Sequence, residues 1–180
     1  GPHDRDCLEH PLSQNVDFVA VSYVRNASDL APARERIKEA GVHTWIVAKI
    51  EHPAALEKLN EIVEAADVVM VARGDLGVEI PLEEVPAAQE RIVSACLERG
   101  TPVVVATQML ESMVNHARPT RAEVTDVATA IRQHVSAVML SGETAGGRHP
   151  VKAVETMARI AETVEASTAD LPAPPALAAY

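Results

Sequence analysis

Four short apolar runs, each ending in polar or charged residues, constrain the fold of this chain more than any other feature. They are 45–51 (WIVAKIE), 68–77 (VVMVARGDLG), 103–108 (VVVATQ) and 137–144 (AVMLSGET). Strands buried on both faces are continuously apolar, and such strands form parallel sheets whose connections are crossover helices. Amphipathic stretches separate the runs, so the pattern predicts alternating strands and helices. Barrels of this kind carry reactive groups where their strands end, so we expect part of a barrel with its catalytic edge.

Helix signals fill the intervals between the strands. A further strand is expected at 16–22, which gives about five βα units of an α/β fold, a partial (β/α)8 barrel. The expected helices are one capped by Ser28 and ended by Gly41, one opened by Pro53, one over 89–99 ended by Gly100, one behind a capping box at Thr120-Arg121-Ala122-Glu123, and a last one opened by Pro150. The last helix is expected to bury one apolar face, formed by Val151, Val154, Met157, Ile160 and Val164.

Three regions are expected along the chain. Residues 1–15 are a polar N-terminal segment in which Pro11 interrupts any helix. Residues 16–165 hold the partial barrel, and 166–180 are an Ala/Pro-rich linker or disordered tail. An open piece of a barrel exposes strand edges and its inner face, so we expect a homodimer or association with other domains.

Composition excludes several classes of protein. The net charge is −10 and no Lys/Arg cluster offsets it, so a nucleic acid partner is not expected. No apolar run approaches the roughly 20 residues that span a bilayer, so no membrane partner is expected. There are two cysteines and no disulfide pattern, which favours a cytoplasmic location, and Cys96 is interpreted as a small buried apolar residue. Aromatic residues make up only 2%, so the core must be aliphatic.

Lysine and carboxylate side chains end two neighbouring strands. Lys49 and Glu51 point to the same side of their strand, because side chains alternate, and Asp75 follows the next strand. Glu51 and Asp75 together suit Mg²⁺ (or Mn²⁺), with water and substrate oxygens completing the octahedron. The alternatives are a simple ion pair between Lys49 and Glu51, and a helix or turn cap at Asp75.

Small and hydroxyl residues end the other strands. Gly74 and Gly77 allow the backbone to approach a ligand closely, although loops are often rich in glycine. Thr107 and Gln108 end the third run, where the Thr107 hydroxyl either relays a proton or simply bonds to backbone. Ser141 and Glu143 share a face after the fourth run.

Two interpretations of Ser141 and Glu143 have equal weight: support of the site from behind, or capping of the next helix. His43, His116, His134 and His149 are interpreted as solvated surface residues, because no two of them stand at metal-ligand spacing. Together the strand-end groups suit a 2-oxo acid chelated by the metal. Lys49 would stabilise an enolate oxygen or a transferring phosphoryl group, and Thr107 would handle a proton at the methyl carbon.

Five long segments resemble pyruvate kinases in order and spacing. They are 48–53 (AKIEHP), 70–81 (MVARGDLGVEIP), 106–113 (ATQMLESM), 118–123 (RPTRAE) and 139–145 (MLSGETA). The resemblance implies a (β/α)8 barrel in which Lys49 lies beside the transferring phosphoryl group and Glu51 and Asp75 ligate Mg²⁺. It also implies that the backbone of Ala72, Arg73 and Gly74 binds the substrate carboxylate. Thr107 would contact substrate and assist proton transfer, and Gln108, Ser141 and Glu143 would lie behind these groups.

The resemblance begins at the family's fourth barrel strand. We therefore expect the first three strands to be absent, together with the arginine that holds substrate phosphate, the monovalent-cation site, the lid domain and the regulatory C-terminal domain. The stretch 133–136 (QHVS) also replaces a turn that usually carries glycine.

Three functions stay open from the sequence. The first is a pyruvate kinase-like domain that binds phosphoenolpyruvate or a 2-oxo acid and stabilises an enolate, with phosphoryl transfer in the complete enzyme. The second is a repurposed metal-dependent lyase, decarboxylase or isomerase of a 2-oxo acid. The third is a non-catalytic half-barrel scaffold.

Overall fold

The expected strands form a single parallel sheet in the computed structural model, which describes residues 2–168. Five strands lie side by side in chain order: β1 (Phe18–Val21), β2 (Trp45–Ile50), β3 (Val68–Ala72), β4 (Val103–Ala106) and β5 (Ala137–Met139). Every neighbouring pair is parallel. Parallel strands in chain order, joined by helical crossovers, are the arrangement of a (β/α)8 barrel, so the predicted partial barrel is confirmed.

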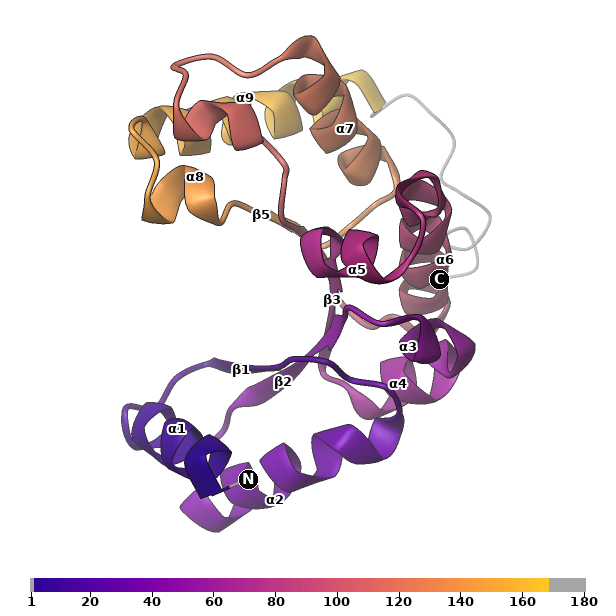
Figure 1. Cartoon of the computed structure of the whole chain (residues 1–180), viewed down its shortest axis with the longest axis vertical. Helices are drawn as coiled ribbons and strands as arrows, with labels where there is room; N and C mark the ends of the chain where they lie inside the picture. The colour runs from indigo at the N-terminus through magenta and orange to yellow at the C-terminus, as the bar shows by residue number, and fades with distance from the viewer. Residues whose placement is uncertain (1, 169–180) are drawn as a thin grey trace.

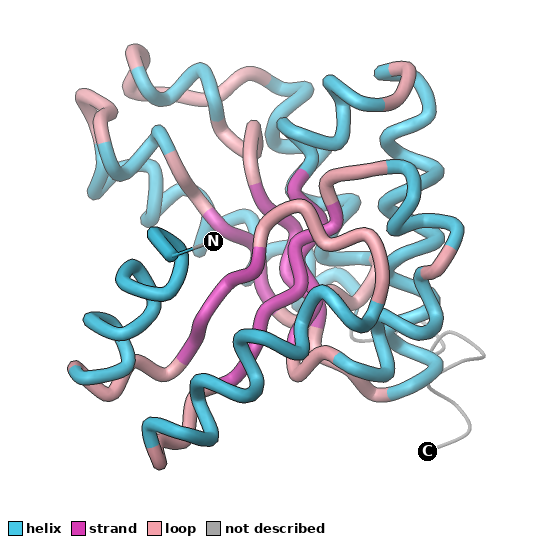
Figure 2. The backbone as a smooth tube through the Cα atoms, turned by 60° about the horizontal axis from the view of Figure 1, so that its bottom comes forward, coloured by secondary structure: helices cyan, strands magenta, loops and turns pink. Residues whose placement is uncertain are grey.

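Helices lie along the outer side of the sheet, and the described part of the chain forms an open arc (Figure 1). Figure 2 shows the strands running together through the middle with helices around them. The helical elements are α1 (Pro2–Ser13), η1 (Ala27–Leu30), α2 (Ala31–Ala40), α3 (Pro53–Glu57), α4 (Leu59–Ala65), α5 (Arg73–Glu79), η2 (Leu82–Glu84), α6 (Val85–Arg99), η3 (Glu111–Val114), α7 (Arg121–Arg132), α8 (Gly142–Ala145) and α9 (Pro150–Thr168). None of the helices between residues 2 and 168 combines the length and the apolar character needed to cross a bilayer.

The hydrophobic core lies between the sheet and these helices. Alternate residues of the central strands, such as Ile46, Val69 and Val105, are completely buried. The core is aliphatic as predicted, with Cys96 buried in it, while Phe18, Tyr23 and Trp45 are each about half exposed. The Cys96 environment confirms its interpretation as a buried apolar residue.

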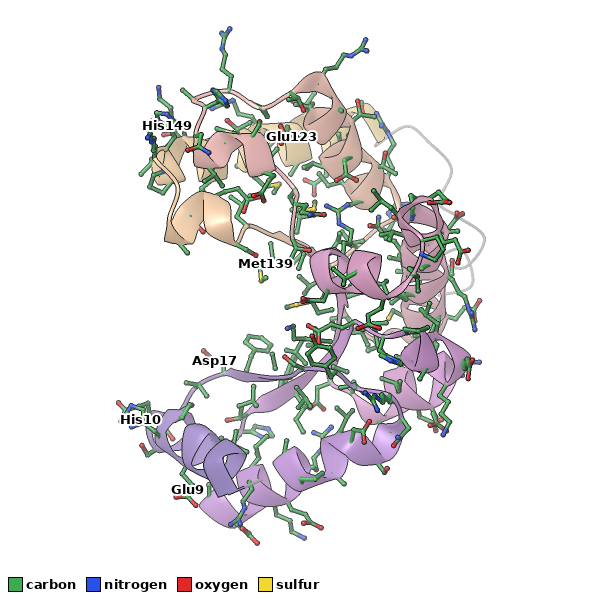
Figure 3. All side chains as sticks on the ribbon, in the orientation of Figure 1. Glu9, His10, Asp17, Glu123, Met139 and His149 are labelled. Atoms are coloured by element: carbon green, nitrogen blue, oxygen red, sulfur yellow. The ribbon has the colours of Figure 1, made fainter. Side chains whose placement is uncertain are left out.

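The inner face of the sheet is open. Phe18 and Trp45 are paired across β1 and β2 and their rings meet edge to face, yet they stay 55% and 47% exposed. Met139 points from β5 toward the same inner side of the arc (Figure 3). A closed barrel would bury these positions, so this face is the part of the fold that still lacks a covering partner.

Several local signals are realised as predicted. Gly41 and Gly100 end α2 and α6 in the left-handed conformation, with φ values of 68° and 67°. Pro53 opens α3, and Pro150 opens α9. Thr120 and Glu123 form the expected reciprocal capping box.

Two predictions near the N-terminus are wrong. Pro11 lies inside α1 rather than interrupting it, because the helix ends two residues later at Ser13 and little of its hydrogen bonding is lost. Leu12, only 3% exposed, anchors this segment in the core. Ser28 is not a cap: Asn26 accepts from the Ser28 backbone N–H and caps η1.

The last helix is also rotated from the predicted face. Ala153, Met157, Ile160 and Val164 are buried, which is a regular helical stripe. Val151 and Val154 lie outside that stripe and are 68% and 53% exposed. Helix α9 continues to Thr168, past the expected boundary at 165, and the Ala/Pro-rich stretch from 169 lies outside the described residues. The helix expected over 89–99 likewise begins earlier, at Val85.

Candidate active site

The end of β2 places Lys49 and Glu51 against each other. Glu51 is 1% exposed, and its Oε1 forms an ion pair with Lys49 Nζ. Lys49 Nζ also lies 3.0 Å from Ser22 Oγ, and Glu51 Oε2 accepts a hydrogen bond of 2.7 Å from the backbone N–H of Tyr23. The Lys49–Glu51 ion pair that the sequence analysis considered is therefore present, and the Glu51 carboxylate in it is buried. A buried charge is costly unless it is paired, and such pairs are frequent at functional sites.

Strand β3 runs directly into α5 without an intervening loop. Ala72 is the N-cap residue, and Arg73, Gly74 and Asp75 form the first turn of the helix. Asp75 is exposed in the first turn of α5, whose N-cap is Ala72, so the helix-cap alternative for Asp75 is not the arrangement observed. Strand β3, which leads into this turn, lies beside β2, and the register pairs Lys49 with Met70.

Thr107 and Gln108 leave β4 in a strained conformation. Their φ values are 69° and 55°, in the left-handed region that non-glycine residues seldom adopt. Thr107 Oγ1 donates to Ala106 O at 2.6 Å and accepts from the Gly74 N–H at 2.7 Å. A Cβ atom on Gly74 would lie 3.3 Å from Thr107 Oγ1, so a larger residue would require Thr107 to shift by a few tenths of an ångström. The backbone-bonded hydroxyl considered from the sequence is the arrangement observed.

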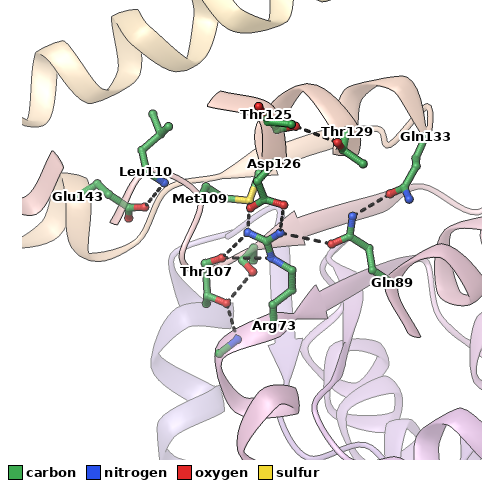
Figure 4. Close-up of polar contacts among 12 residues, drawn as sticks. Arg73, Gln89, Thr107, Met109, Leu110, Thr125, Asp126, Thr129, Gln133 and Glu143 are labelled. Carbon is green, nitrogen blue, oxygen red and sulfur yellow. Dashed lines mark hydrogen bonds and ion pairs between the residues drawn. The ribbon is translucent and has the colours of Figure 1, made fainter. Parts of the chain in front are cut away.

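Arg73 holds this strained turn with its buried side chain (Figure 4). Its Nη2 lies 2.9 Å and its Nε 3.3 Å from Thr107 O, and Nη1 lies 2.8 Å from Asp126 Oδ1. Gln89 accepts a longer bond from Nη1 and donates to Gln133, while Nη2 also contacts Met109 Sδ. The guanidinium is thus fixed on every side and determines where the β4 turn lies.

Two partners of Arg73, Gln89 and Asp126, were missed by the sequence analysis. The position of Gln89 carried a signal in the sequence, because its spacing places it on the same helical face as the apolar residues Ile92 and Cys96. The structure shows that Gln89 is buried on that face, at 5% exposed. Asp126 lies 53 residues from Arg73 and shows no pattern that points to it. Only the packing of α7 beside the β4 turn brings it there.

Glu143 joins the turns that follow β4 and β5. It is completely buried, its Oε1 accepts from the Leu110 N–H at 3.0 Å, and its Oε2 accepts from the Ser141 N–H at 2.8 Å. Glu143 therefore links the backbone before α8 to the segment after Thr107, and its support of a site stays a prediction. The Ser141 side chain makes no capping bond to α8.

The donors present suit a magnesium ion better than a transition metal. Within residues 2–168 no group of three or more His, Cys, Asp and Glu side chains is placed to hold a metal. Glu51 and Asp75 are two carboxylates that follow adjacent strands, and the oxygens of Glu51 are engaged by Lys49 and by the Tyr23 N–H. Two carboxylates are a set that Mg²⁺ can use, since this ion usually keeps water and substrate oxygens for its other positions. The histidines stand apart: His43, His116 and His134 are exposed as predicted, whereas His149 is partly buried, and His134 adopts a left-handed φ of 61°.

Comparison with known proteins decides the family of this fold and site. The family model described as "Pyruvate kinase, barrel domain" matches residues 2–154. The chain belongs to the pyruvate kinase family. It is 54% identical over 162 residues to a pyruvate kinase of Methylorubrum extorquens, and 52% over 164 residues to one of Dictyostelium discoideum. These matches cover 90% and 89% of this chain but 33% and 32% of the two pyruvate kinases.

A plastid relative extends the same comparison. The chloroplastic pyruvate kinase isozyme G of Ricinus communis is 47% identical over 173 residues, which is 96% of this chain and 41% of that protein. The chain therefore spans about a third of the length of the pyruvate kinases it matches. The resemblance stated from five sequence segments is confirmed at the level of the family.

Proposed function

We propose that this chain forms the metal and enolate side of a pyruvate kinase site. It binds Mg²⁺ or Mn²⁺ with phosphoenolpyruvate or a 2-oxo acid, stabilises an enolate, and contributes to phosphoryl transfer in a complete enzyme. The observation that supports this proposal is the buried Lys49–Glu51 pair beside the Gly74–Thr107 contact, at the carboxyl ends of adjacent strands. Active sites of α/β barrels lie at that edge.

Each residue has a defined role in this proposal. Glu51 and Asp75 hold the metal, which when bound supplies Lewis acidity to the substrate carbonyl. Lys49 Nζ, fixed next to Glu51, places a positive charge beside the enolate oxygen or the transferring phosphoryl group.

Substrate positioning falls to the first turn of α5 and to the β4 turn. The backbone of Ala72, Arg73, Gly74 and Asp75 lies at the start of α5, where N–H groups lack helical partners and suit a carboxylate, although the Gly74 N–H already donates to Thr107 Oγ1. Thr107 holds a proton at Oγ1 near the methyl carbon of the substrate. Gln108, Ser141 and Glu143 support the turns from behind, and Glu143 does so through its two backbone bonds.

Proton exchange tests the proposal without requiring nucleotide. Pyruvate methyl protons are followed by NMR in D₂O with Mg²⁺ or Mn²⁺, and Lys49→Ala is compared with the chain. We expect metal-dependent exchange that falls about 100-fold in Lys49→Ala, because the charge that stabilises the enolate is lost. Lys38→Ala, on α2, is the matched control and should exchange normally. Equal exchange rates in Lys49→Ala and Lys38→Ala, or no exchange from the folded parent chain, would contradict the proposal.

The open inner face supports a second part of the proposal, which is association. A second copy of the chain, or other domains, covers Phe18, Trp45 and Met139, because an exposed apolar sheet face favours burial. Sedimentation velocity should show a dimer that Met139→Arg disrupts, while Val151→Arg on α9 leaves it intact. A monomer at all concentrations would contradict self-association. The cytoplasmic location predicted from the cysteine content stays a prediction.

A further inference from the structure

An open surface pocket lined by exposed basic side chains lies between α9 and the loop that precedes α7, apart from every residue assigned to the proposed active site. Its volume is about 500 Å³, within the range of pockets that hold small ligands. The lining residues are Ala117, Arg118, Pro119, Lys152, Glu155, Thr156 and Arg159. We call this cavity the basic pocket.

Helix α9 presents one side of the basic pocket at helical spacing. Lys152, Thr156 and Arg159 follow each other at i, i+4 and i+7, so they share one face of the helix. The rotation of α9 is fixed, because Ala153, Met157 and Ile160 form its buried stripe. The cationic face therefore cannot turn away without exposing that stripe.

The loop side of the pocket is equally well fixed. Glu123 accepts from the backbone N–H and the hydroxyl of Ser112, and it also accepts from the N–H of Thr120. These bonds hold the loop at both of its ends. The backbone N–H of Arg148 donates to Val114 O at 2.8 Å and joins this loop to the segment before α9. Pro119 restricts the backbone of Arg118, so the guanidinium extends from a stiff support.

The charges of the basic pocket are not neutralised within the described residues. Neither Arg118 nor Lys152 forms an ion pair or a side-chain hydrogen bond in residues 2–168, and within the same residues the Arg159 guanidinium bonds only to Thr156 Oγ1, at 3.0 Å. In contrast, Arg34 and Arg36 are each paired with a carboxylate. Three cations and the single carboxylate of Glu155 leave a surplus of two positive charges, on a chain whose net charge is −10.

We propose that the basic pocket binds the phosphate group of a small molecule. A phosphate monoester carries close to two negative charges at neutral pH, which matches the surplus of two, whereas a monocarboxylate carries one. Arg118 and Arg159 supply planar guanidinium donors that suit phosphate oxygens, and Lys152 supplies a point charge. The Thr156 hydroxyl accepts from Arg159, which leaves its own proton for the ligand.

Phosphate titration tests this proposal independently of any catalysis. Inorganic phosphate and glycerol phosphate are added to ¹⁵N-labelled chain at constant ionic strength, with acetate as the comparison anion. We expect saturable amide shifts confined to 117–118 and 152–159, with binding at least about tenfold tighter for phosphate than for acetate. Binding should weaken as the pH falls below about 6, because the phosphate loses its second charge.

Three variants separate a formed site from a diffuse positive field. Arg118→Gln and Arg159→Gln should each weaken phosphate binding about tenfold or more. Arg121→Gln removes the same charge three residues from Arg118 but does not line the pocket, so it should bind phosphate normally. All three side chains are exposed, and unchanged thermal unfolding midpoints will show that each variant is folded.

Several outcomes would overturn the proposal. A diffuse positive field alone would be indicated by amide shifts that grow with phosphate without saturation, or by equal shifts with acetate. Phosphate binding that weakens as much in Arg121→Gln as in Arg118→Gln would indicate the same. A Glu-rich peptide that binds these residues more tightly than phosphate would instead assign the pocket to a protein partner. Failure here leaves the metal and enolate proposal untouched, since the two sites share no residue.

Discussion

Arg73 donates two hydrogen bonds to the backbone carbonyl of Thr107, at 2.9 and 3.3 Å, across 34 residues of sequence. The neighbouring Gly74 N–H bonds to the hydroxyl of the same threonine. Thr107 is therefore held from both its carbonyl and its side chain in a left-handed conformation that is unfavourable by itself. The first turn of α5 and the turn after β4 behave as one structural unit.

The Arg73–Asp126 ion pair should stabilise this unit. Asp126→Asn leaves a guanidinium that is 9% exposed without its charge partner. Loss of one partner of a buried pair costs about 3–5 kcal/mol, and the 38% exposure of Asp126 reduces the expectation to about 1–2 kcal/mol. Urea unfolding measures the change. Glu39→Gln, which breaks the exposed pair with Arg36, should cost less than about 0.5 kcal/mol; equal losses would mean that burial does not matter here.

Metal binding should depend on both carboxylates at the strand ends. Glu51→Gln and Asp75→Asn are each expected to weaken Mn²⁺ binding by at least about tenfold, because each removes a charged oxygen ligand. Electron paramagnetic resonance of free Mn²⁺ measures the affinity. Glu57→Gln, which changes an exposed carboxylate of α3, serves as the control. Undiminished binding in either site variant would remove that residue from the proposed metal site.

Stability should depend on pH through Glu123. Its partial burial raises the pKa, but hydrogen bonds from Ser112 and Thr120 outweigh burial, so the pKa lies below the usual value of 4.5. The stabilisation is therefore present above about pH 4.5 and is lost as the pH falls through the lowered pKa. Glu123→Gln should unfold more easily at pH 7 and equal the parent chain at low pH. Parallel stability curves for the two chains between pH 7 and 3 would contradict this account.

Cys96 should be unreactive in the folded chain. Burial raises the pKa of its thiol from 9.0 to about 12, although nearby Arg99 lowers it slightly. In a Cys7→Ser background, no thiolate absorbance should appear between pH 7 and 10. The unfolded chain ionises near pH 9, so this group contributes stability below that pH and loses it as the pH rises toward 12. Rapid reaction with a thiol reagent at pH 8 under native conditions would show that the thiol is accessible.

Much of the fold could be predicted from local patterns. The strands were found from continuous apolar runs, and the ends of α2 and α6 from Gly41 and Gly100, since each signal depends on residues within a few positions. The same local reasoning failed at Pro11 and on the exposed side of α9. Pro11 is tolerated because α1 ends two residues later, at Ser13, and the packing of α9 on neighbouring elements decides which of its residues are buried.

The sequence by itself determined the family, the order of strands and helices, and the residue types at the strand ends. These depend on periodicity and on backbone preferences that each short segment carries within itself. Only the tertiary structure decided that Lys49 pairs with a buried Glu51, that Asp126 holds Arg73, and that Arg118 meets Lys152 and Arg159. The physical reason is that the packing of helices on the twisted sheet sets these distances, and residues far apart in sequence carry no local mark of such a meeting.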